Sequence, residues 1–373
     1  MGEHFMKVGV LTSSRADYGI YLPLLNKIKK DPYFDLEIIA FGTHLSEKFG
    51  FTLNDIKKDN YNIIHEVVTL EDDDDSQKGI SISYGNTILK FSKFWQEHSF
   101  NLIFCLGDRY EMSGAVQAGI PFGLKFAHIH GGETTLGAID NIYRHQITLA
   151  STLHFTSTDE FSKKVIELTG ISENVYNVGS LSLDGIENYM PIKKHIFLDK
   201  FKIPNPEFAL ITFHPETINP NSNKVFAVEM RNALAQLSKK IFLVITMPNA
   251  DTLGSIFRLE IQNLKNDFPN QILCIENFGK ENYFNAMFFA SVIIGNSSSG
   301  IIEAASFNKY VVNVGDRQKG RLQSKNCIDT PFKEVEMINA INKALVLNEY
   351  EGDNIYCKLA TTKIIINNLK NIK

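Results

Sequence analysis

Short apolar segments alternate with longer amphipathic segments along the whole chain. The apolar segments are rich in Val, Ile, Leu and Phe and do not alternate with polar residues, which is typical of strands covered by helices on both faces of a parallel sheet. The segments predicted as strands are Lys7–Thr12, Leu36–Phe41, Ile63–Val68, Leu102–Leu106, Leu124–Ile129, Leu153–Thr156, Val175–Val178, Phe208–Phe213, Ile241–Met247, Ile272–Glu276, Val292–Gly295 and Tyr310–Val314. The helices predicted between them include Ile80–His98, Thr158–Thr169, Lys224–Ser238 and Lys333–Asn348. This alternation predicts a doubly wound α/β protein.

The alternation lapses once, over the proline-containing stretch Met190–Pro206, which is typical of a linker. A length of 373 residues also fits two domains better than one. We therefore predict an N-terminal domain over residues 6–189 and a C-terminal domain over residues 207–353. In the last segment, residues 354–373, we expect a helix that packs back on the N-terminal domain.

Composition and charge exclude several classes of protein. The net charge is −4, whereas binding to nucleic acid or to an anionic membrane needs a concentrated basic surface. No apolar run approaches the roughly 20 residues that span a bilayer. The cysteines, Cys105, Cys274, Cys327 and Cys357, are far apart and form no CxxC pair. We therefore expect a cytoplasmic protein with reduced thiols and no metal site.

Two loops of the N-terminal half carry candidate chemistry directly after predicted strands. Arg15 lies on a polar loop at the start of a helix, where backbone N–H groups and a guanidinium can bind an oxyanion together; the alternative is a surface arginine paired with Asp17. Asp108 and Arg109 follow the strand Leu102–Leu106, where a carboxylate needs a partner or a function. The alternative for Asp108 is a helix N-cap.

The densest polar stretch follows the strand Leu124–Ile129. It consists of His130, Gly131, Gly132 and Glu133, and then Asp140, Arg144 and His145. Paired glycines allow the backbone to approach a ligand closely. A histidine and carboxylates within a few residues supply groups suited to proton transfer. The pattern predicts an acid/base site in the N-terminal domain.

A serine-rich segment in the C-terminal half has the pattern of an anion site. Ser297, Ser298 and Gly300 lead into a predicted helix over Ile301–Phe307, and hydroxyls with free N–H groups at a helix start suit a diphosphate. Glu303, predicted in the first turn of this helix, suits the hydroxyls of a ribose. The alternative for Glu303 is an interaction with the helix dipole only.

Three further loops of the C-terminal half carry polar residues after predicted strands. His214 and Asn249 follow two of them, and Arg317 adds a cation after a third. The chain contains neither GxGxxG nor a Walker A motif. NAD chemistry and ATP hydrolysis are therefore not supported.

These motifs together resemble the UDP-N-acetylglucosamine 2-epimerases, particularly the hydrolysing branch of sialic-acid and related nonulosonic-acid pathways. The resemblance extends from Met6 to about Asp329. The motifs that carry it are Ser14-Arg15-Ala16-Asp17-Tyr18-Gly19, Gly107-Asp108-Arg109, His128-Ile129-His130-Gly131-Gly132-Glu133, Ile139-Asp140, Arg144-His145, Phe213-His214-Pro215, Met247-Pro248-Asn249, Gly295-Asn296-Ser297-Ser298-Ser299-Gly300-Ile301-Ile302-Glu303 and Gly315-Asp316-Arg317-Gln318-Lys319-Gly320-Arg321.

The resemblance implies a GT-B fold, in which two Rossmann-like domains face an interdomain cleft. It implies that a base removes the C2 proton of a UDP-sugar as UDP leaves C1, and that water then adds to the 2-acetamidoglucal to give N-acetylmannosamine. No cofactor is implied. A UDP-sugar is the implied partner, and the implied assembly is a homodimer or homotetramer.

The resemblance also assigns roles to residues of this chain. The acid/base candidates are Asp108, Glu133, Asp140, His214 and His130. The UDP-binding candidates are Arg15, Asn249, Ser297, Ser298, Gly300, Glu303 and Arg317. The residues expected near the sugar are His44, Arg109 and Arg144.

One residue departs from the family pattern. Several relatives have a glutamate, considered catalytic, at the position of His130. Asp108 or Asp140 would then be alternative bases, or the substrate would be a 2,4-diacetamido-2,4,6-trideoxy sugar of the legionaminic-acid type. The rival functions are a non-hydrolysing epimerase, a GT-B glycosyltransferase and a nucleotide-sugar sensor.

Overall fold

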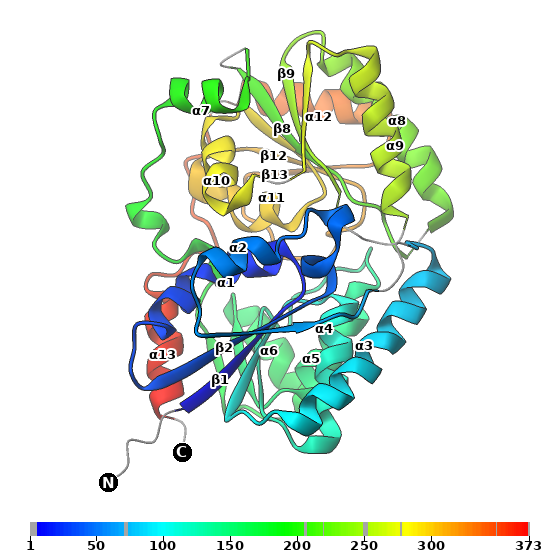
Figure 1. The fold of residues 1–373 in the computed structure, drawn as a ribbon. Coiled ribbons are helices and arrows are strands. Elements are labelled where there is room, and N and C mark those ends of the chain that lie inside the picture. Colours follow the sequence, from blue (N-terminus) through cyan, green and yellow to red (C-terminus); the bar gives the residue numbers. More distant parts are fainter. Residues whose placement is uncertain are drawn as a thin grey trace. The chain divides into compact units, whose positions relative to one another are not determined.

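The computed structural model describes residues 6–70, 74–204, 207–218, 220–248, 253–276, 278–347 and 349–371. These residues form two compact units, each built around one parallel β-sheet (Figure 1). Unit 1 takes in the described residues up to Glu133, those of Asp140–Gly185 and those from Tyr356 onward. Unit 2 takes in those of Thr134–Ile139 and Ile186–Ile355.

The sheet of unit 1 has the strand order β3-β2-β1-β4-β5-β6-β7, and all of its strands run parallel. The strands are β1 (Met6–Thr12), β2 (Phe34–Phe41), β3 (Ile63–Val67), β4 (Leu102–Leu106), β5 (Phe126–Ile129), β6 (Leu153–Thr156) and β7 (Val175–Asn177). They agree with the strands predicted in this half. The order reverses between β1 and β4, and such a reversal opens a crevice for ligands at the carboxyl ends of the strands.

Helices cover both faces of this sheet. One face packs on α1 (Arg15–Ile28), α2 (Leu53–Lys58) and α13 (Thr361–Asn371). The other packs on α3 (Gln77–Glu97), α4 (Tyr110–Gly119) and α5 (Asp140–Ala150), which lie side by side in Figure 1. Helix α6 (Asp159–Thr169) lies beside α5 and contacts β6 and β7. Both faces are thus apolar, which explains why the strands carry no alternating polar residues.

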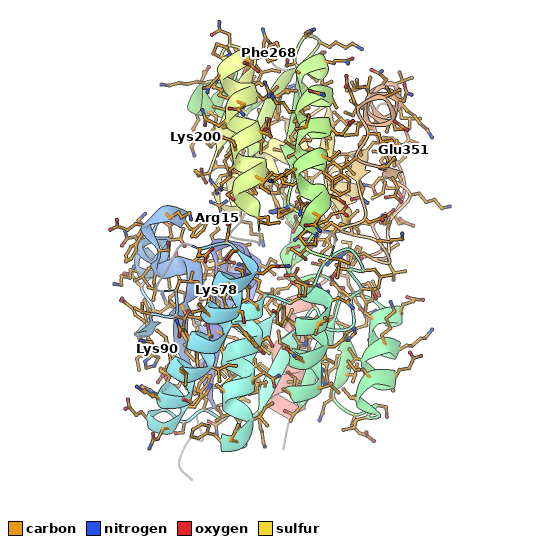
Figure 2. All side chains as sticks on the ribbon, turned by 90° about the vertical axis from the view of Figure 1, so that its right-hand side faces the viewer. Arg15, Lys78, Lys90, Lys200, Phe268 and Glu351 are labelled. Atoms are coloured by element: carbon orange, nitrogen blue, oxygen red, sulfur yellow. The ribbon has the colours of Figure 1, made fainter. Side chains whose placement is uncertain are left out.

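Local signals explain where two of these helices begin. Ser14 caps α1 in a reciprocal capping box with Asp17, and Ser76 caps α3 by accepting a hydrogen bond from the N–H of Gly79. Lys78 and Lys90 of α3 are exposed, and Figure 2 labels both. The apolar side of α3 therefore faces the sheet while its lysines face water.

The sheet of unit 2 has the order β10-β9-β8-β11-β12-β13, again with all strands parallel. The strands are β8 (Phe208–Thr212), β9 (Phe242–Thr246), β10 (Ile272–Ile275), β11 (Val292–Gly295), β12 (Val311–Val314) and β13 (Cys327–Thr330). Strand β13 was not predicted from the sequence. Within the described residues it pairs with β12 alone and exposes Asp329, so it lacks the apolar run of a central strand.

Unit 2 also has helices on both faces of its sheet. One face packs on α8 (Asn223–Leu237), α9 (Gly254–Asp267) and α12 (Glu334–Val346). The other packs on α7 (Lys194–Phe201), α10 (Gly279–Phe289) and the 3₁₀ turn η7 (Ala304–Phe307). Helix α7 lies within the stretch predicted as a linker, and its Phe197 is buried against the core. The remaining short elements are α11 (Ser298–Ile302), η1 (Gly42–Leu45), η2 (Glu47–Phe49), η3 (Ile120–Phe122), η4 (Leu181–Leu183), η5 (Ile186–Asn188) and η6 (Pro220–Ser222).

Candidate active site

The loop after β1 is organised by one buried carboxylate, that of Asp17. It accepts hydrogen bonds from the hydroxyl of Thr12 at 2.6 Å and from the backbone N–H of Ser13 at 2.8 Å. Burial alone would raise the pKa of Asp17, but its interactions with His44, Thr12 and Ser13 outweigh burial and lower the pKa. The loop is thus rigid at the first residue of α1, Arg15, which Figure 2 labels.

His44 lies beneath this loop and is fully buried. Its Nε2 atom is 2.9 Å from the hydroxyl of Thr12, and its Nδ1 atom is 2.7 Å from the hydroxyl of Thr52. Both ring nitrogens are therefore engaged inside unit 1. The geometry fits a residue that fixes the loop, whereas the resemblance implies a position at the sugar.

The loop after β4 contains Asp108 and Arg109. Arg109 is the N-cap residue of α4, so the N-cap alternative for Asp108 does not hold. The guanidinium of Arg109 binds the fully buried Glu111 through two nitrogens, at 3.2 and 2.9 Å. This bidentate pair fixes Arg109 at the start of the helix.

Arg144, on α5, joins the loops that follow β4 and β5. Its Nη2 atom pairs with Asp108, and its Nη1 atom lies 3.1 Å from Oε2 of Glu133. Burial lowers the pKa of Arg144, but the charges of Asp108 and Glu133 outweigh burial and raise it. A buried cation with two carboxylate partners is strongly held, because removing any one of them leaves an uncompensated charge. The structure therefore brings together three residues that the sequence placed up to 36 positions apart.

His130 follows β5 in a left-handed conformation, with φ 67°. This conformation costs a residue other than glycine roughly 1–2 kcal/mol. The His130 Nδ1 atom is 2.6 Å from Oε1 of Glu133, and the same oxygen accepts a hydrogen bond of 2.9 Å from Ser157. Ser157 was not identified as a site residue from the sequence, because it follows β6 and is far from the motif.

The glycine pair between His130 and Glu133 serves the packing of unit 1. A Cβ atom on Gly132, which has φ 78°, would lie 2.3 Å from the backbone oxygen of Phe161. A Cβ atom on Gly131 would lie 3.0 Å from Nδ1 of His128. These glycines let the chain turn tightly and bring Glu133 back to His130, and the prediction that they also allow a ligand to approach stays a prediction.

His128 was not singled out as a site residue, although it holds the loop that carries Asp108. Its Nε2 atom is 2.8 Å from the carbonyl oxygen of Gly107, and its Nδ1 atom is 3.1 Å from the hydroxyl of Thr148. A carbonyl can only accept, so Nε2 carries the proton and Nδ1 accepts from Thr148. Burial lowers the pKa of His128 to about 3, which keeps the ring neutral. A histidine within an otherwise apolar strand was the available sequence signal.

Asp140 is the first residue of α5, and the segment that separates it from Glu133 belongs to unit 2. Within that segment the Leu136 N–H donates to the carbonyl of Lys319 at 2.9 Å. A Cβ atom on Gly137 would lie 2.1 Å from the backbone oxygen of Asp316, so only glycine fits there.

In unit 2, Asn296 ties together the loops after β8, β11 and β12. Its side chain accepts from the His214 N–H at 2.7 Å and donates to the His214 carbonyl at 2.8 Å. Its own carbonyl accepts from Arg317 at 3.2 Å and from Gln318 at 2.9 Å. The predicted site residues His214 and Arg317 are therefore held by one fully buried residue, His214 by its side-chain amide and Arg317 by its backbone carbonyl.

Hydroxyl groups line the start of α11. Ser297 is its N-cap, and its Oγ atom is 3.0 Å from Oγ of Ser299, which is 2.7 Å from the Tyr283 hydroxyl. Burial raises the pKa of Tyr283 to about 12, so this network is neutral. Gly300 is buried, and a Cβ atom there would lie 3.1 Å from Val311.

The position of Glu303 corrects the sequence prediction. Glu303 is the C-cap of the five-residue helix α11 and does not lie in the first turn of a longer helix. The helix starts earlier than predicted because Ser297 caps it, and it ends where the 3₁₀ turn η7 begins. The predicted UDP-binding residue Asn249 lies outside the described residues.

Three observations on the described part of the chain concern other classes of protein. It contains no group of three or more His, Cys, Asp or Glu side chains able to hold a metal ion. None of its helices combines the length and the apolar character that crossing a membrane requires. Cys105, Cys274, Cys327 and Cys357 are free thiols.

The two parallel sheets and their strand orders define the class of the protein: it has the GT-B fold of two Rossmann-like domains. A family model described as UDP-N-acetylglucosamine 2-epimerase matches residues 26–370. The chain belongs to this family.

Relatives support this membership. The chain is 32% identical to the polysialic acid biosynthesis protein P7 of Escherichia coli, over 90% of this chain and 85% of that protein. It is 32% identical to a GDP/UDP-N,N'-diacetylbacillosamine 2-epimerase (hydrolyzing) of Campylobacter jejuni, over 88% and 85%. It is 30% identical to a UDP-N,N'-diacetylbacillosamine 2-epimerase (hydrolyzing) of Legionella pneumophila, over 94% and 92%.

A solved structure supports the fold. The UDP-GlcNAc 2-epimerase of Neisseria meningitidis, bound to UDP-GlcNAc, superposes with a TM-score of 0.79 over 98% of this chain and 100% of that one, at 16% identity.

Proposed function

We propose that the protein is a hydrolysing 2-epimerase that converts UDP-N-acetylglucosamine into N-acetylmannosamine and UDP. The observation that carries the proposal is the network at the carboxyl ends of β4 and β5, in which the buried Arg144 pairs with the partly exposed Asp108 and with the buried Glu133, and Glu133 pairs with His130. The carboxylates and the histidine can transfer protons, and the charge of Arg144 holds the carboxylates in place. All of these groups lie in unit 1. Two of the relatives are named as hydrolysing 2-epimerases.

The first half-reaction is an elimination. A base takes the C2 proton, the electron pair of the C2–H bond forms a C1–C2 double bond, and the C1–O bond breaks with its electron pair leaving on UDP. The C2 proton beside an acetamido group is very weakly acidic, and a positioned base supplies only about 10²–10⁴-fold. Stabilisation of the charge on the leaving diphosphate must supply most of the remainder.

The second half-reaction is a hydration. Water adds its oxygen to C1 and gives up one of its protons, and a proton is delivered to C2 on the face opposite to the one from which the first proton left. Elimination and hydration are together redox-neutral, so the proposed reaction needs no redox cofactor. Because removal and delivery take place on opposite faces of C2, two different proton-transferring groups are required. Asp108 and Asp140 are the candidates for one of them.

Unit 2 would bind UDP in the proposed reaction. Ser297 and Ser298 would bind the diphosphate together with Arg317, and Glu303 would bind the ribose. Hydroxyl and guanidinium donors can bind a diphosphate directly, and for this reason we propose metal-independent binding.

Unit 1 would bind the reacting end of the substrate. Arg15 would meet the diphosphate from the start of α1. In view of their contacts, we propose that His44 and Arg109 hold loops and that Arg144 holds the carboxylates, so that none of the three binds the sugar directly.

A second candidate substrate is UDP-N,N'-diacetylbacillosamine. The names of the relatives from Campylobacter jejuni and Legionella pneumophila favour it. This sugar has an acetamido group at C4 and lacks the 6-hydroxyl. A pocket built for one of the two sugars would reject the other, because a buried polar group would be left unpaired.

Proton NMR of the purified protein with each UDP-sugar in D₂O tests the proposal. N-acetylmannosamine and UDP, with deuterium at C2, are the expected products from UDP-N-acetylglucosamine. Turnover of the diacetamido sugar alone would identify the second candidate. UDP-N-acetylmannosamine as the product would place the protein on the non-hydrolysing branch, and no turnover of either sugar would contradict the proposal.

The proposal extends to the setting of the reaction. We place it in the cytoplasm, which the four free thiols favour, and we expect a homodimer or homotetramer by analogy with the family. Light scattering of the purified protein tests the assembly.

A further inference from the structure

His130 and Glu133 have the arrangement of a histidine that transfers a proton and a carboxylate that orients it. The Nδ1 atom of His130 is 2.6 Å from Oε1 of Glu133, which is paired with Arg144 through its other oxygen. An ionised carboxylate only accepts hydrogen bonds, so Nδ1 carries the proton and the lone pair of the neutral ring lies on Nε2. This Nε2 atom is buried and has no hydrogen-bond partner among the described residues.

The oxygens of Glu133 are engaged by donors. Oε1 accepts from Ser157 at 2.9 Å as well as from His130, and Oε2 accepts from Arg144 at 3.1 Å. A group that takes a proton from carbon needs a lone pair directed at the C–H bond. Glu133 is therefore placed to support His130, whereas Nε2 of His130 has the lone pair that the reaction requires.

The backbone of His130 shapes the turn that carries the ring. Its φ of 67° is a conformation that glycine or asparagine adopts with less strain. Such strain persists only where the surrounding structure holds it. The strained turn holds the ring against Glu133, while the His130 N–H remains bonded to the Phe155 carbonyl at 3.0 Å.

We propose that His130 is the catalytic residue that removes the C2 proton through Nε2, and that Glu133 is a positioning residue that acts through His130. The proposal rests on the proposed function. The Nε2 lone pair bonds to the C2 proton, the C2–H electron pair becomes the C1–C2 double bond, and the electron pair of the C1–O bond leaves on UDP. Glu133 holds the ring in the productive tautomer and balances the charge of the imidazolium. A different group then delivers a proton to the opposite face of C2.

Two variants of His130 that both tolerate its backbone conformation test the assignment. His130→Gly removes the ring and leaves room for added imidazole, whereas His130→Asn fills part of that room without supplying a base. We expect both to lose C2–H cleavage by about 10²–10⁴-fold, with UDP affinity unchanged in calorimetry. Added imidazole should raise the rate of His130→Gly by about tenfold or more and leave His130→Asn unchanged. An equal response of the two variants to imidazole would overturn the assignment.

The hydration half-reaction supplies a separate readout. Since another group delivers the second proton, His130→Gly should still hydrate added 2-acetamidoglucal at a rate within about threefold of the unaltered protein. Loss of hydration to the same degree as loss of C2–H cleavage would mean that the histidine is needed generally, and it would overturn the assignment.

A double-mutant cycle tests the role of Glu133. Glu133→Gln should slow C2–H cleavage in the unaltered background and have no further effect in the His130→Gly background, because Glu133 acts through the ring. Equal losses in both backgrounds would contradict a positioning role. No turnover by the unaltered protein would overturn the proposed function, and this assignment with it. Turnover by the unaltered protein together with undiminished turnover by His130→Gly would overturn the assignment alone.

Discussion

The first six strands of unit 1 follow the same order as the six strands of unit 2, but the two units carry polar groups of different kinds at the ends of their strands. In unit 1 the loops after β4 and β5 are joined by a buried ionic network centred on Arg144. In unit 2 the loops after β8, β11 and β12 are joined by the side-chain amide and the backbone carbonyl of Asn296, whose partners include the guanidinium of Arg317. Carboxylates and imidazoles can take up a moving proton, whereas amides, hydroxyls and a guanidinium can bind an anion without titrating. The same type of fold thus provides two kinds of site. From this difference follows our proposal that unit 1 carries the proton transfer and unit 2 binds UDP.

The largest effect expected from this contrast is on turnover. Asp108→Asn keeps the shape of the side chain and a possible hydrogen bond to Arg144 but removes the charge. We expect kcat to fall by about 10²–10⁴-fold while UDP affinity stays nearly unchanged, because Asp108 is not among the residues assigned to UDP binding. Single-turnover kinetics and UDP titration calorimetry measure the two quantities. Normal turnover in this variant would remove Asp108 from the mechanism.

The next effect concerns the stability of the ionic network. Arg144→Met leaves the carboxylates of Asp108 and Glu133 without their shared cation, so we expect the free energy of unfolding to fall by about 3–5 kcal/mol. The control is Arg231→Met in unit 2, since Arg231 pairs with Glu260 and Asp267 at the surface. It should cost less than about 1 kcal/mol. Scanning calorimetry compares the two variants. Similar losses of unfolding free energy would show that the Arg144 network contributes no more to stability than a surface ion pair.

The pH dependence of stability offers a test confined to unit 1. Burial lowers the pKa of His128 to about 3 and that of His154 to about 4, from an ordinary value of 6.5. The folded form therefore binds these protons less readily than the unfolded chain. Their full contribution to stability is present above pH 6.5, and it is lost as the pH falls toward 4 and then 3, by about 1.4 kcal/mol for each unit of pKa shift.

The single tryptophan, Trp95, lies in the core of unit 1 and reports on its unfolding. Urea unfolding followed by its fluorescence should require less urea at pH 5 than at pH 7. The matched variant His128→Gln cannot gain a proton, so its loss between the two pH values should be smaller. If stability against urea falls equally between pH 7 and pH 5 in both proteins, His128 is not the titrating group.

A smaller effect is expected from the serine-rich segment of unit 2. Ser298→Ala removes one hydroxyl, and we expect UDP affinity to fall by about tenfold, the size of one hydrogen bond to a charged group. Turnover at saturating substrate should change much less. Calorimetry with UDP tests this expectation, and unchanged binding would contradict the assignment of the serine-rich segment.

The smallest effect is expected from removal of metal ions. We propose that the guanidinium and hydroxyl donors hold the diphosphate, so dialysis against EDTA should leave turnover unchanged within about twofold. If EDTA abolished activity and a divalent cation restored it, the protein's own donors would not suffice to hold the diphosphate.

Much of the fold could be predicted because it depends on local signals. Buried parallel strands have apolar runs that are visible in the sequence, and caps such as Ser14 and Ser76 mark helix starts. The prediction was wrong at β13, an edge strand without such a run. It was also wrong at α7, because the prolines around this helix indicated a linker. Helix α7 forms because Phe197 is buried against the core of unit 2, and such a tertiary contact leaves no local pattern.

The loops that form the site could be predicted from the sequence, but the hydrogen bonds and ion pairs between their side chains could not. Strand ends placed Asp108, Glu133 and His130 at one edge of a sheet. That Arg144 holds two of these groups while Ser157 supports Glu133 depended on the packing of α5 and on the loop after β6. The early start of α11 likewise moved Glu303 from a first turn to a C-cap.

Apolar periodicity and residue type are local properties, so the class of fold, the family and the available chemistry could be inferred from the order of residues alone. The packing of the chain was needed to show which nitrogen of His130 is bonded to Glu133, that both nitrogens of His44 are engaged inside unit 1, and that His128 holds Gly107. The physical reason is that a hydrogen bond requires two atoms to meet within about 3 Å. Residues far apart in the chain meet at that distance only once the sheet and its helices have packed.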